Sequence, residues 1–376
     1  MNVLRVVTAV YPGPTQPRRG HFVASLHRFL AHSFHSEVLA PRVFKGDPGE
    51  EQHPQLTVRR FRYRSGNRLP KAGRLSPTML CSYLHSGTRA ARRWWPKEDA
   101  ERGGLVLAHW IVPAGWIAAG VARRLRLPLV LYGHGSDLHR YGQLPLFRPV
   151  ISRLLRQAKL TVVASRELAE IAARLSARRA SDFPVLPVGI ESSFRAEDRP
   201  PLAPPPFRVL FVGDFLASKG FHRLLAAVKE LVQRGLEVQL QVAGSGPQRQ
   251  LFQSRDYPWL SDLGELDSQG VRQAMATSHL LMLPSRGEGT PLVVQEALAM
   301  RLPVASTEVG GIPDLFHHRS GWTRLRDGDP AEVAGCIEKL AAEGAQGVER
   351  RWQEMGANST EELFAEAWAE RLREVL

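Results

Sequence analysis

The first half of the chain alternates short apolar runs with segments in which apolar residues recur at helical spacing. The short runs predict strands at residues 3–10, 105–108, 129–132 and 161–164. The helical spacing predicts helices at residues 22–30, 114–125 and 150–158. Strands and helices in this order predict parallel pairing, with helices on both faces of one sheet.

A proline-rich stretch separates the two halves of the chain. Residues 199–206 contain five prolines, so this stretch is neither a helix interior nor a central strand. The pattern then restarts, and we expect strands at residues 207–212, 238–243, 280–283 and 304–305, with helices at 224–232 and from 289 to 300. Residues 360–376 have the pattern of an amphipathic helix with one buried face. The second half therefore forms a second α/β unit.

Length and composition support two globular units. The chain has 376 residues, of which 43% are hydrophobic and 23% charged, which is too long for one ordinary core. No apolar run approaches the roughly 18–20 residues that span a bilayer. The first ten residues are interpreted as a core strand rather than a secretory signal. Cys81 and Cys336 are far apart and match no metal or disulfide pattern, which favours free thiols in a reducing cytosol.

The positive charge is concentrated in the first half. Residues 1–190 hold 30 Lys and Arg against 11 Asp and Glu, whereas residues 191–376 hold 20 against 26. A field of this kind indicates that the first half meets an anionic partner, such as nucleic acid, anionic lipid or a phosphorylated substrate. The alternative is that arginines simply decorate a solvated surface.

The most informative segment is residues 284–313, which read PSRGEGTPLVVQEALAMRLPVASTEVGGIP. A strand ends at Pro284, a glycine-containing loop follows, and a helix is expected to start near Pro291. The exposed N–H groups of such a start can bind a phosphate or a sugar hydroxyl. Glu288 in the loop and Glu296 on the helix can each accept hydrogen bonds from neighbouring hydroxyls. By spacing alone, the pair could equally be solvated glutamates near a helix N-terminus.

The segment resembles the E-x7-E signature of family 4 retaining glycosyltransferases, which have the GT-B fold. The matching runs are EGTPLVVQEALA and PVASTEVGG. The resemblance implies that Glu288 contacts the transferred sugar and that Glu296 grips the nucleotide ribose. It also implies that the amides of the intervening loop contact the sugar and diphosphate, through Gly289, Thr290, Pro291, Leu292 and Val293, although Pro291 has no amide hydrogen.

Three further motifs in the second half match the same family. In VLFVGDFLASKG, the resemblance makes Lys219 a phosphate-binding residue, and a lysine there can neutralise diphosphate charge. Many members also carry an arginine after the strand's Gly213, where this chain has Asp214; Arg223 or Arg286 is a possible substitute. The other expected donor-binding positions are Gly244 of the Gly-x-Gly turn and the base-contacting loop Gly264, Glu265 and Leu266.

Two motifs in the first half also match. YGHGSD follows a strand, and its His134 lies between glycines at a strand's carboxyl end, where ligands bind. The resemblance places His134 near the reacting sugar, while Asp137 either holds the loop or caps a helix. His109 and Trp110 fit the family but equally fit core packing. Gly20, after Arg18 and Arg19, matches the glycine that approaches the donor.

Two segments of the first half mix arginines with aromatic residues. They contribute the candidate acceptor or membrane residues Arg59, Arg62, Arg92, Arg93, Trp94 and Trp95. Arginine with tryptophan is typical of an interfacial membrane patch and also of a single-stranded nucleic-acid platform. Residues 59–64 could instead be an edge strand with an arginine-covered outer face. Because family members often use lipid-linked or lipopolysaccharide acceptors, the resemblance favours an anionic membrane surface, with no nucleic acid expected.

The resemblance implies an α/β protein of the GT-B type, with two Rossmann-like parallel-sheet domains facing a central cleft. We expect an acceptor-binding domain at 1–195, a nucleotide-sugar-binding domain at 196–358 and a helix at 359–376 that crosses back to the first domain. The implied reaction is metal-independent, cofactor-free transfer from a UDP- or GDP-sugar to a saccharide or lipid-linked acceptor, with retention. Same-face attack with the leaving diphosphate as base is expected.

The expected setting is cell-envelope glycan biosynthesis, in the cytoplasm on the inner face of the membrane. The alternatives are a GT-B nucleotide-sugar epimerase and a non-catalytic nucleotide-sugar or nucleic-acid-binding protein of this fold.

Overall fold

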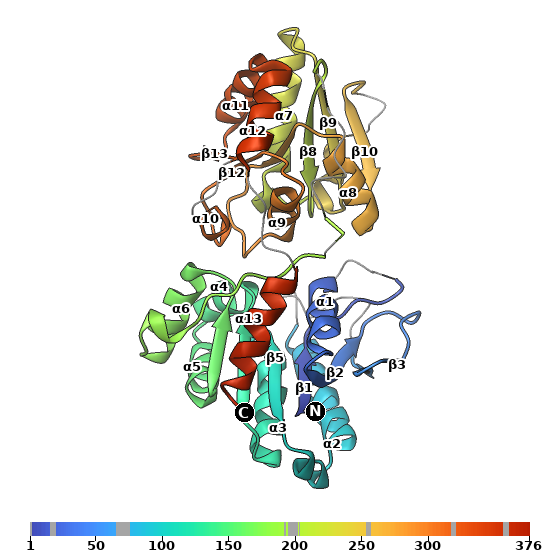
Figure 1. The fold of residues 1–376 in the computed structure, drawn as a ribbon, viewed down its shortest axis with the longest axis vertical. Helices are drawn as coiled ribbons and strands as arrows, with labels where there is room; N and C mark the ends of the chain where they lie inside the picture. The colour runs from blue at the N-terminus through green and yellow to red at the C-terminus, as the bar shows by residue number, and fades with distance from the viewer. Residues whose placement is uncertain are drawn as a thin grey trace. The chain divides into compact units, whose positions relative to one another are not determined.

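The computed structural model describes residues 2–15, 20–64, 76–191, 193–194, 202, 204–252, 257–316, 321–355 and 361–376. Within these residues the chain divides into two compact units. Unit 1 contains residues 1–189 together with 361–376, and unit 2 contains residues 190–360. Figure 1 shows the C-terminal helix, in red, among the blue and green elements of unit 1. Residues from both ends of the sequence therefore build one unit.

Unit 1 is built on a seven-stranded sheet in the order β3-β4-β2-β1-β5-β6-β7. Its strands are β1 (Asn2–Thr8), β2 (Phe34–Arg42), β3 (Glu50–His53), β4 (Leu56–Arg62), β5 (Leu105–His109), β6 (Leu129–Gly133) and β7 (Leu160–Val163). All neighbouring strands pair in parallel except β3, which is antiparallel to β4. The expected parallel α/β class is therefore confirmed for this half.

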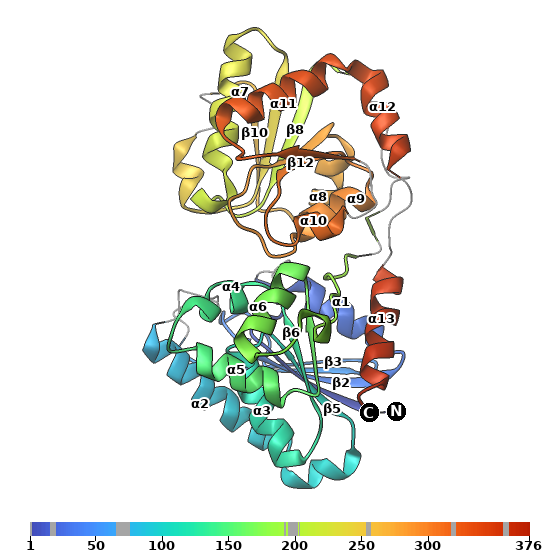
Figure 2. The same cartoon turned by 90° about the vertical axis from the view of Figure 1, so that its left-hand side faces the viewer.

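The helices of unit 1 cover both faces of its sheet. They are α1 (His21–Leu30), α2 (Pro77–Trp94), α3 (Ala114–Leu125), α4 (Ser136–His139), α5 (Arg148–Gln157), α6 (Arg166–Ser176) and α13 (Glu361–Arg373). Figure 2 shows α1 and α13 on one side of the sheet, with α2, α3 and α5 on the other. This arrangement follows from right-handed crossovers, because α1 leads from β1 to β2 whereas α3 leads from β5 to β6, in the opposite direction across the sheet.

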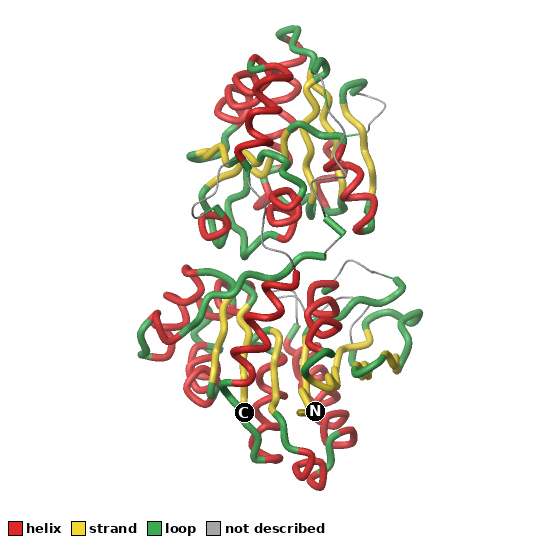
Figure 3. The backbone as a smooth tube through the Cα atoms, viewed as in Figure 1, coloured by secondary structure: helices red, strands yellow, loops and turns green. Residues whose placement is uncertain are grey.

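Unit 2 has a six-stranded, all-parallel sheet in the order β10-β9-β8-β11-β12-β13. The strands are β8 (Phe207–Val212), β9 (Val238–Ala243), β10 (Leu260–Gly264), β11 (Leu280–Leu283), β12 (Val304–Thr307) and β13 (Trp322–Leu325). The helices are α7 (Phe221–Gln233), α8 (Ser268–Ala276), α9 (Leu292–Ala299), α10 (Ile312–Leu315), α11 (Pro330–Ala342) and α12 (Gly344–Glu354). Helices and strands alternate along this unit in Figure 3.

Most expected elements have the expected bounds, and two interpretations are wrong. The first strand ends at Thr8 rather than at residue 10. The arginine-rich strand β4 ends at Arg62 and lies between β2 and β3, so β3 and not β4 forms the edge of the sheet. In the described part of the chain, no helix is long and apolar enough to cross a membrane.

Candidate active site

The loops at the carboxyl ends of the unit 2 strands carry the residues expected to bind a donor. Gly213 and Lys219 follow β8, Gly244 follows β9, and Glu265 and Leu266 follow β10, which itself ends at Gly264. Residues 284–291 connect β11 to α9 and carry Glu288, Gly289, Thr290 and Pro291. Parallel strands place these loops at one edge of the sheet, which is where open α/β sheets bind ligands.

Lys219 and Glu288 form an ion pair in unit 2. The Nζ atom of Lys219 donates to Oε2 of Glu288, and the hydroxyl of Ser285 donates to Oε1 at 2.7 Å. Glu288 is buried, whereas Lys219 is half-buried. The structure therefore brings together two residues that are 69 positions apart in the sequence. Both oxygens of the Glu288 carboxylate have a donor, which fixes the orientation of the side chain.

Backbone contacts hold the loop that carries Glu288. The amide of Arg286 donates to the carbonyl of Ser218 at 2.7 Å, which ties this loop to the one that carries Lys219. On the other side, the amide of Gly311 donates to the carbonyl of Gly289 at 2.7 Å. Gly310 has φ +62°, and a Cβ there would lie 2.1 Å from the Glu288 carbonyl oxygen. Only glycine fits this close approach between the two loops.

The helix after this loop begins as expected. Pro291 is the N-cap of α9, and Leu292 and Val293 occupy its half-buried first turn. Glu296 is the fifth residue of α9 and is fully buried. A carboxylate buried on the helix that follows the Glu288 loop is suited to hold hydroxyls at a fixed depth, because its side chain cannot swing into solvent.

Close backbone packing explains the glycine that follows β9. A Cβ on Gly244, which has φ +136°, would lie 2.0 Å from the Gly213 carbonyl oxygen. The amide of Gly244 donates to the carbonyl of Gly264 at 2.7 Å, which joins this turn to the end of β10. Beside it, the Ser245 hydroxyl donates to the exposed Glu265 carboxylate. The three loop ends therefore form one connected rim.

The structure distinguishes between Arg223 and Arg286, the two candidates for a second cation in the donor site. Arg223 is buried, and its guanidinium donates to the carbonyls of Pro284 and Asp327, the latter at 2.8 Å. Burial, followed by the nearby charge of Arg286, lowers the pKa of Arg223. Arg223 therefore stabilises the loops that contain Pro284 and Asp327 and is itself buried beneath them. Arg286 is exposed, lies two residues before Glu288, and remains available for an anion.

His134 in unit 1 ends a chain of three histidines. His134 Nε2 lies 3.0 Å from His109 Nδ1, and His109 Nε2 lies 2.9 Å from His27 Nε2. His27 Nδ1 lies 3.4 Å from the Ser36 hydroxyl. Burial lowers the pKa of His27 and of His134 to about 3, and that of His109 well below its ordinary value. All three rings are therefore neutral at physiological pH.

Neutral histidines in series share one hydrogen-bond direction. Each neutral ring carries a single N–H, so a donor at one contact requires an acceptor at the other nitrogen of that ring. The direction of the hydrogen bond at Ser36 and the donor or acceptor role of His134 Nδ1 are therefore coupled, although the Ser36 hydroxyl itself can act in either role. This Nδ1 atom is buried without a hydrogen-bond partner among the described residues. A polar group that forms a hydrogen bond with this Nδ1 atom would therefore select the tautomer of all three histidines.

Aromatic side chains surround His134. The ring centroids of Tyr132, Trp110 and Phe22 lie 4.1, 4.4 and 5.2 Å from that of His134. The Tyr132 ring in turn packs against Trp368 of α13 at 4.7 Å. This packing leaves His134 only a small range of motion.

Asp137, in the short helix α4 that follows β6, has a structural role. Asp137 is fully buried, and its carboxylate accepts from the amides of Ile111 and Gly135 at 2.8 and 2.9 Å. Desolvation outweighs these bonds and raises its pKa. Of the two interpretations of Asp137, loop holding is therefore the one the contacts support. Gly20 is the buried N-cap of α1, and Arg18 and Arg19 lie outside the described residues.

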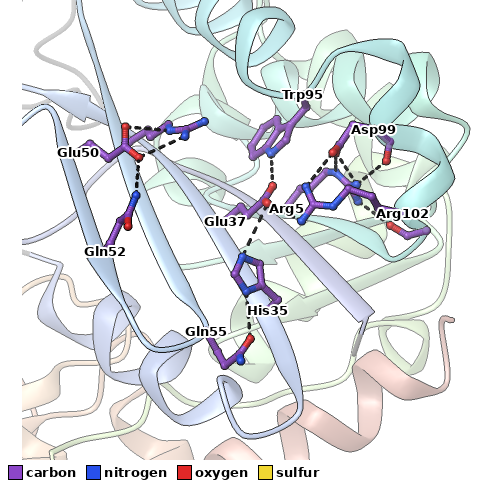
Figure 4. Close-up of polar contacts among 11 residues, drawn as sticks. Arg5, His35, Glu37, Glu50, Gln52, Gln55, Trp95, Asp99 and Arg102 are labelled. Atoms are coloured by element: carbon purple, nitrogen blue, oxygen red, sulfur yellow. Dashed lines mark hydrogen bonds and ion pairs between the residues drawn. The ribbon is translucent and has the colours of Figure 1, made fainter.

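The expected membrane patch is only partly exposed, and Trp95 is the clear error. Trp95 is fully buried and donates to Glu37 Oε2 at 2.7 Å, within the network of Arg5, Asp99 and Arg102 drawn in Figure 4. A buried indole with a carboxylate partner cannot lie among lipid headgroups. The guanidinium of Arg59 covers the half-buried Trp94 ring at 4.4 Å and pairs with Glu50 at 3.1 Å. Arg62, Arg92 and Arg93 are exposed.

Sequence reasoning missed several residues that complete these sites. Ser285 orients Glu288, His27 and Ser36 extend the histidine chain, and Trp368 packs on Tyr132. Ser285 lies inside the recognised motif, so its position three residues before Glu288 was the available signal. Nothing in the sequence links His27 to His109, because 82 positions separate them.

Comparisons with known proteins agree with this architecture. The family model described as "Glycosyl transferases group 1" matches residues 206–343, and the "Glycosyl transferase 4-like domain" matches residues 6–189.

The chain is similar to the putative teichuronic acid biosynthesis glycosyltransferase TuaC of Bacillus subtilis, with 33% identity over 226 residues, 56% of this chain and 55% of TuaC. It is also similar to the putative colanic acid biosynthesis glycosyltransferase WcaL of Escherichia coli, with 28% identity over 59% of this chain and 57% of WcaL. The chain thus spans a little over half the length of these relatives.

Solved structures show the same fold. Sucrose-phosphate synthase of Thermosynechococcus elongatus superposes with a TM-score of 0.77 at 19% identity, covering 99% of both chains. HepE of Anabaena, in complex with UDP, has a TM-score of 0.68 at 16% identity, covering 100% of both chains. The two family matches together account for both units, and the chain belongs to the group 1, family 4-like glycosyltransferases with the GT-B fold.

Proposed function

We propose that the chain is a retaining glycosyltransferase that moves a sugar from a nucleotide-sugar donor to a saccharide or lipid-linked acceptor in cell-envelope glycan biosynthesis. The Lys219–Glu288 pair carries this proposal, because it sets a cation and a carboxylate side by side on the loops that match the family. The relatives TuaC and WcaL, named for teichuronic and colanic acid biosynthesis, support a bacterial polysaccharide as product.

The ion pair suggests how the donor is bound. A diphosphate at this edge of the sheet competes for Lys219, and the Glu288 carboxylate is then free to accept from sugar hydroxyls. Arg286 is the second cation and takes the role that Asp214 cannot fill. Lys219 and Arg286 together stabilise the negative charge that develops as the sugar–phosphate bond breaks. Under this proposal the reaction requires no metal and no cofactor.

The other donor contacts follow from the loop positions. Glu296 holds the ribose, and the rim that joins Ser245 to Glu265 faces the base. The amides of Gly289, Thr290 and the first turn of α9 contact the phosphates. UDP is the favoured nucleotide, because the solved structures of HepE with similar fold contain UDP or UDP-glucose. His134, on unit 1, is the proposed catalytic residue near the reacting sugar.

The setting remains part of the proposal. We propose a cytoplasmic enzyme on the inner face of the membrane, since the basic unit 1 favours an anionic surface. Arg62, Arg92 and Arg93 are exposed and stay candidates for this contact, whereas Trp95 is not a candidate because it is buried.

A thermal-shift series tests the donor site. UDP, GDP, ADP and CMP, each with its sugar derivatives, are added to the native chain and to Glu296→Gln, which preserves the size of the buried side chain. One nucleotide should raise the melting temperature of the native chain by mass action and should lose most of this effect with Glu296→Gln. If no nucleotide stabilises the native chain, the proposed function is wrong. The anomeric configuration of a product, read by NMR, then tests retention.

A further inference from the structure

A hollow lies on the outer helix layer of unit 1, away from the strand ends described above. Helices α2, α3 and α5 lie side by side there (Figure 2). Their side chains line a cavity of about 630 Å³. Four arginines reach it, namely Arg92 from α2, Arg123 and Arg124 from α3, and Arg153 from α5. We call this hollow the arginine pocket.

No carboxylate among the described residues forms an ion pair with any of these four arginines. Among the residues that the structure describes, Arg124 donates to the carbonyls of Ala91 and Trp95, and its buried Nε atom has no hydrogen-bond partner there. Burial, followed by the neighbouring charge of Arg92, lowers the pKa of Arg124, and the charge of Asp99 opposes this shift only in part. Four cations in one hollow repel one another, and a bound anion would relieve that repulsion.

The shape of the arginine pocket suits a compact group. Gly120 on α3 leaves its floor open, because a Cβ there would meet nothing within 4 Å. Trp116, in the first turn of α3, also lines the pocket and is 47% exposed. Seven residues separate Trp116 from Arg123, which is about 10 Å along the helix. The pocket therefore has a cationic end and an aromatic end.

We propose that the arginine pocket binds a phosphate group. Guanidinium groups match phosphate oxygens in geometry as well as charge, and they form bidentate, charge-assisted hydrogen bonds with them. The phosphate can come from the head group of an anionic lipid or from a soluble phosphate ester. This site goes beyond the proposed glycosyl transfer, because it uses none of the donor-binding residues. It shares Arg92 with the proposed membrane contact, and a lipid head group in the pocket would rest on that part of the proposed function.

Two binding assays distinguish the two sources of phosphate. In the first, the chain is sedimented with phosphatidylcholine vesicles that contain or lack phosphatidylglycerol. In the second, inorganic pyrophosphate is titrated by calorimetry. Each assay compares the native chain with Arg123→Gln/Arg153→Gln, which removes two exposed pocket arginines. The matched control is Arg156→Gln/Arg174→Gln, which removes two exposed arginines outside the pocket.

A third variant separates the pocket from surface charge. Gly120→Leu fills the floor and leaves all four arginines in place. We expect the double pocket variant to weaken binding to phosphatidylglycerol vesicles about 25-fold, since each arginine near an anionic surface contributes about fivefold. We expect Gly120→Leu to weaken it similarly and the control pair to change it less than about twofold. If the native chain binds pyrophosphate but not vesicles, and the pocket variants weaken pyrophosphate binding while the control pair does not, the ligand is a soluble phosphate ester.

Three results would overturn the inference. The first is that the native chain binds neither probe, and the second is that the control pair weakens binding as much as the pocket pair. The third is that a single-stranded polyuridine binds through these arginines while vesicles and pyrophosphate do not. Melting curves of each variant confirm that it is folded. Because donor binding is read separately by the nucleotide thermal shift, failure of this inference and failure of the proposed function are distinguishable.

Discussion

At the scale of single residues, Lys219 carries the most direct prediction. Lys219→Gln removes the cation but keeps a polar side chain of similar length. We expect kcat/KM for sugar transfer to fall about 10²- to 10³-fold, the range for loss of one donor that stabilises charge in the transition state. Steady-state rates with the donor found by thermal shift measure this change. Lys229→Gln, on an exposed position of α7, is the matched control and should leave the rate unchanged. Equal losses in both variants would refute the assignment.

The histidine chain predicts a dependence of stability on pH. The pKa values of His27 and His134 are about 3 in the folded chain and about 6.5 when unfolded, so the unfolded state binds more protons between these values. Stability is therefore full above about pH 6.5 and is lost as the pH falls toward 3. For one such histidine, the loss between pH 7 and pH 5 is about 2 kcal/mol.

Replacement of His27 tests this linkage. In His27→Gln the difference in free energy of unfolding between pH 7 and pH 5 should shrink by about 2 kcal/mol, because one buried neutral histidine no longer takes up a proton on unfolding. Urea denaturation at both pH values measures the difference. His53→Gln, at an exposed position of β3, should leave the difference as in the native chain. An unchanged difference in His27→Gln would show that His27 is not held neutral.

At the scale of elements, the loop between β11 and α9 depends on one glycine of another loop. Gly310→Ala adds a Cβ 2.1 Å from the Glu288 carbonyl oxygen in a left-handed conformation. We expect a loss of about 2 kcal/mol or more in the free energy of unfolding, together with weaker nucleotide binding, since the Glu288 loop must shift. Gly335→Ala on α11, where a Cβ meets nothing within 4 Å, should instead stabilise by about 0.5–1 kcal/mol. Chemical denaturation with and without nucleotide compares the two variants.

The elements also show what the sequence could and could not predict. Strands β8, β9 and β11 have the predicted bounds. The apolar run of β11 is buried on both faces, whereas β9 alternates buried apolar residues with half-buried glutamines, and both patterns are typical of strands. Strand β2 was not predicted, since it contains Ser36 and Glu37, which are buried only because His27 and Trp95 reach them from elsewhere. The same limit applies to the site. Motifs located His134, Glu288 and Lys219, and Ser285 lies inside the Glu288 motif. His27, Ser36 and Trp368, which extend the contacts around His134, come instead from distant parts of the chain.

At the scale of the whole molecule, the two units differ in charge. Residues 1–189 and 361–376, which build unit 1, hold 32 Lys and Arg against 16 Asp and Glu, a net charge of +16, whereas residues 190–360 hold 18 against 21, a net charge of −3. Within unit 1 this surplus is not spread evenly, since four arginines converge on the arginine pocket while Arg5 and Arg60 are buried with acidic partners. Charge therefore divides the chain as the contacts do, with phosphate-binding chemistry predicted on both units but on different elements.

The last segment of the chain stabilises the first unit rather than the second. Residues 361–376 belong to unit 1, and Trp368 is fully buried against Tyr132, which packs on His134. Trp368→Ala should lower the free energy of unfolding of unit 1 by about 3–5 kcal/mol, as expected for loss of a large core side chain. Because the two units have separate cores, a global melting temperature would not isolate this effect.

Amide hydrogen exchange measures the local stability of each unit separately. In Trp368→Ala, peptides from β5 and β6 should exchange faster than in the native chain, while peptides from β8 and β11 should keep the native rates. Trp116→Ala changes an exposed tryptophan of the same unit, so its exchange should match the native chain. Faster exchange in β8 and β11 would mean that α13 supports unit 2 as well, against the division drawn from the contacts. If faster exchange is confined to unit 1, Trp368 stabilises the strands of that unit. The histidine chain would then depend on the last helix of the sequence, because Trp368 packs on Tyr132 and Tyr132 packs on His134.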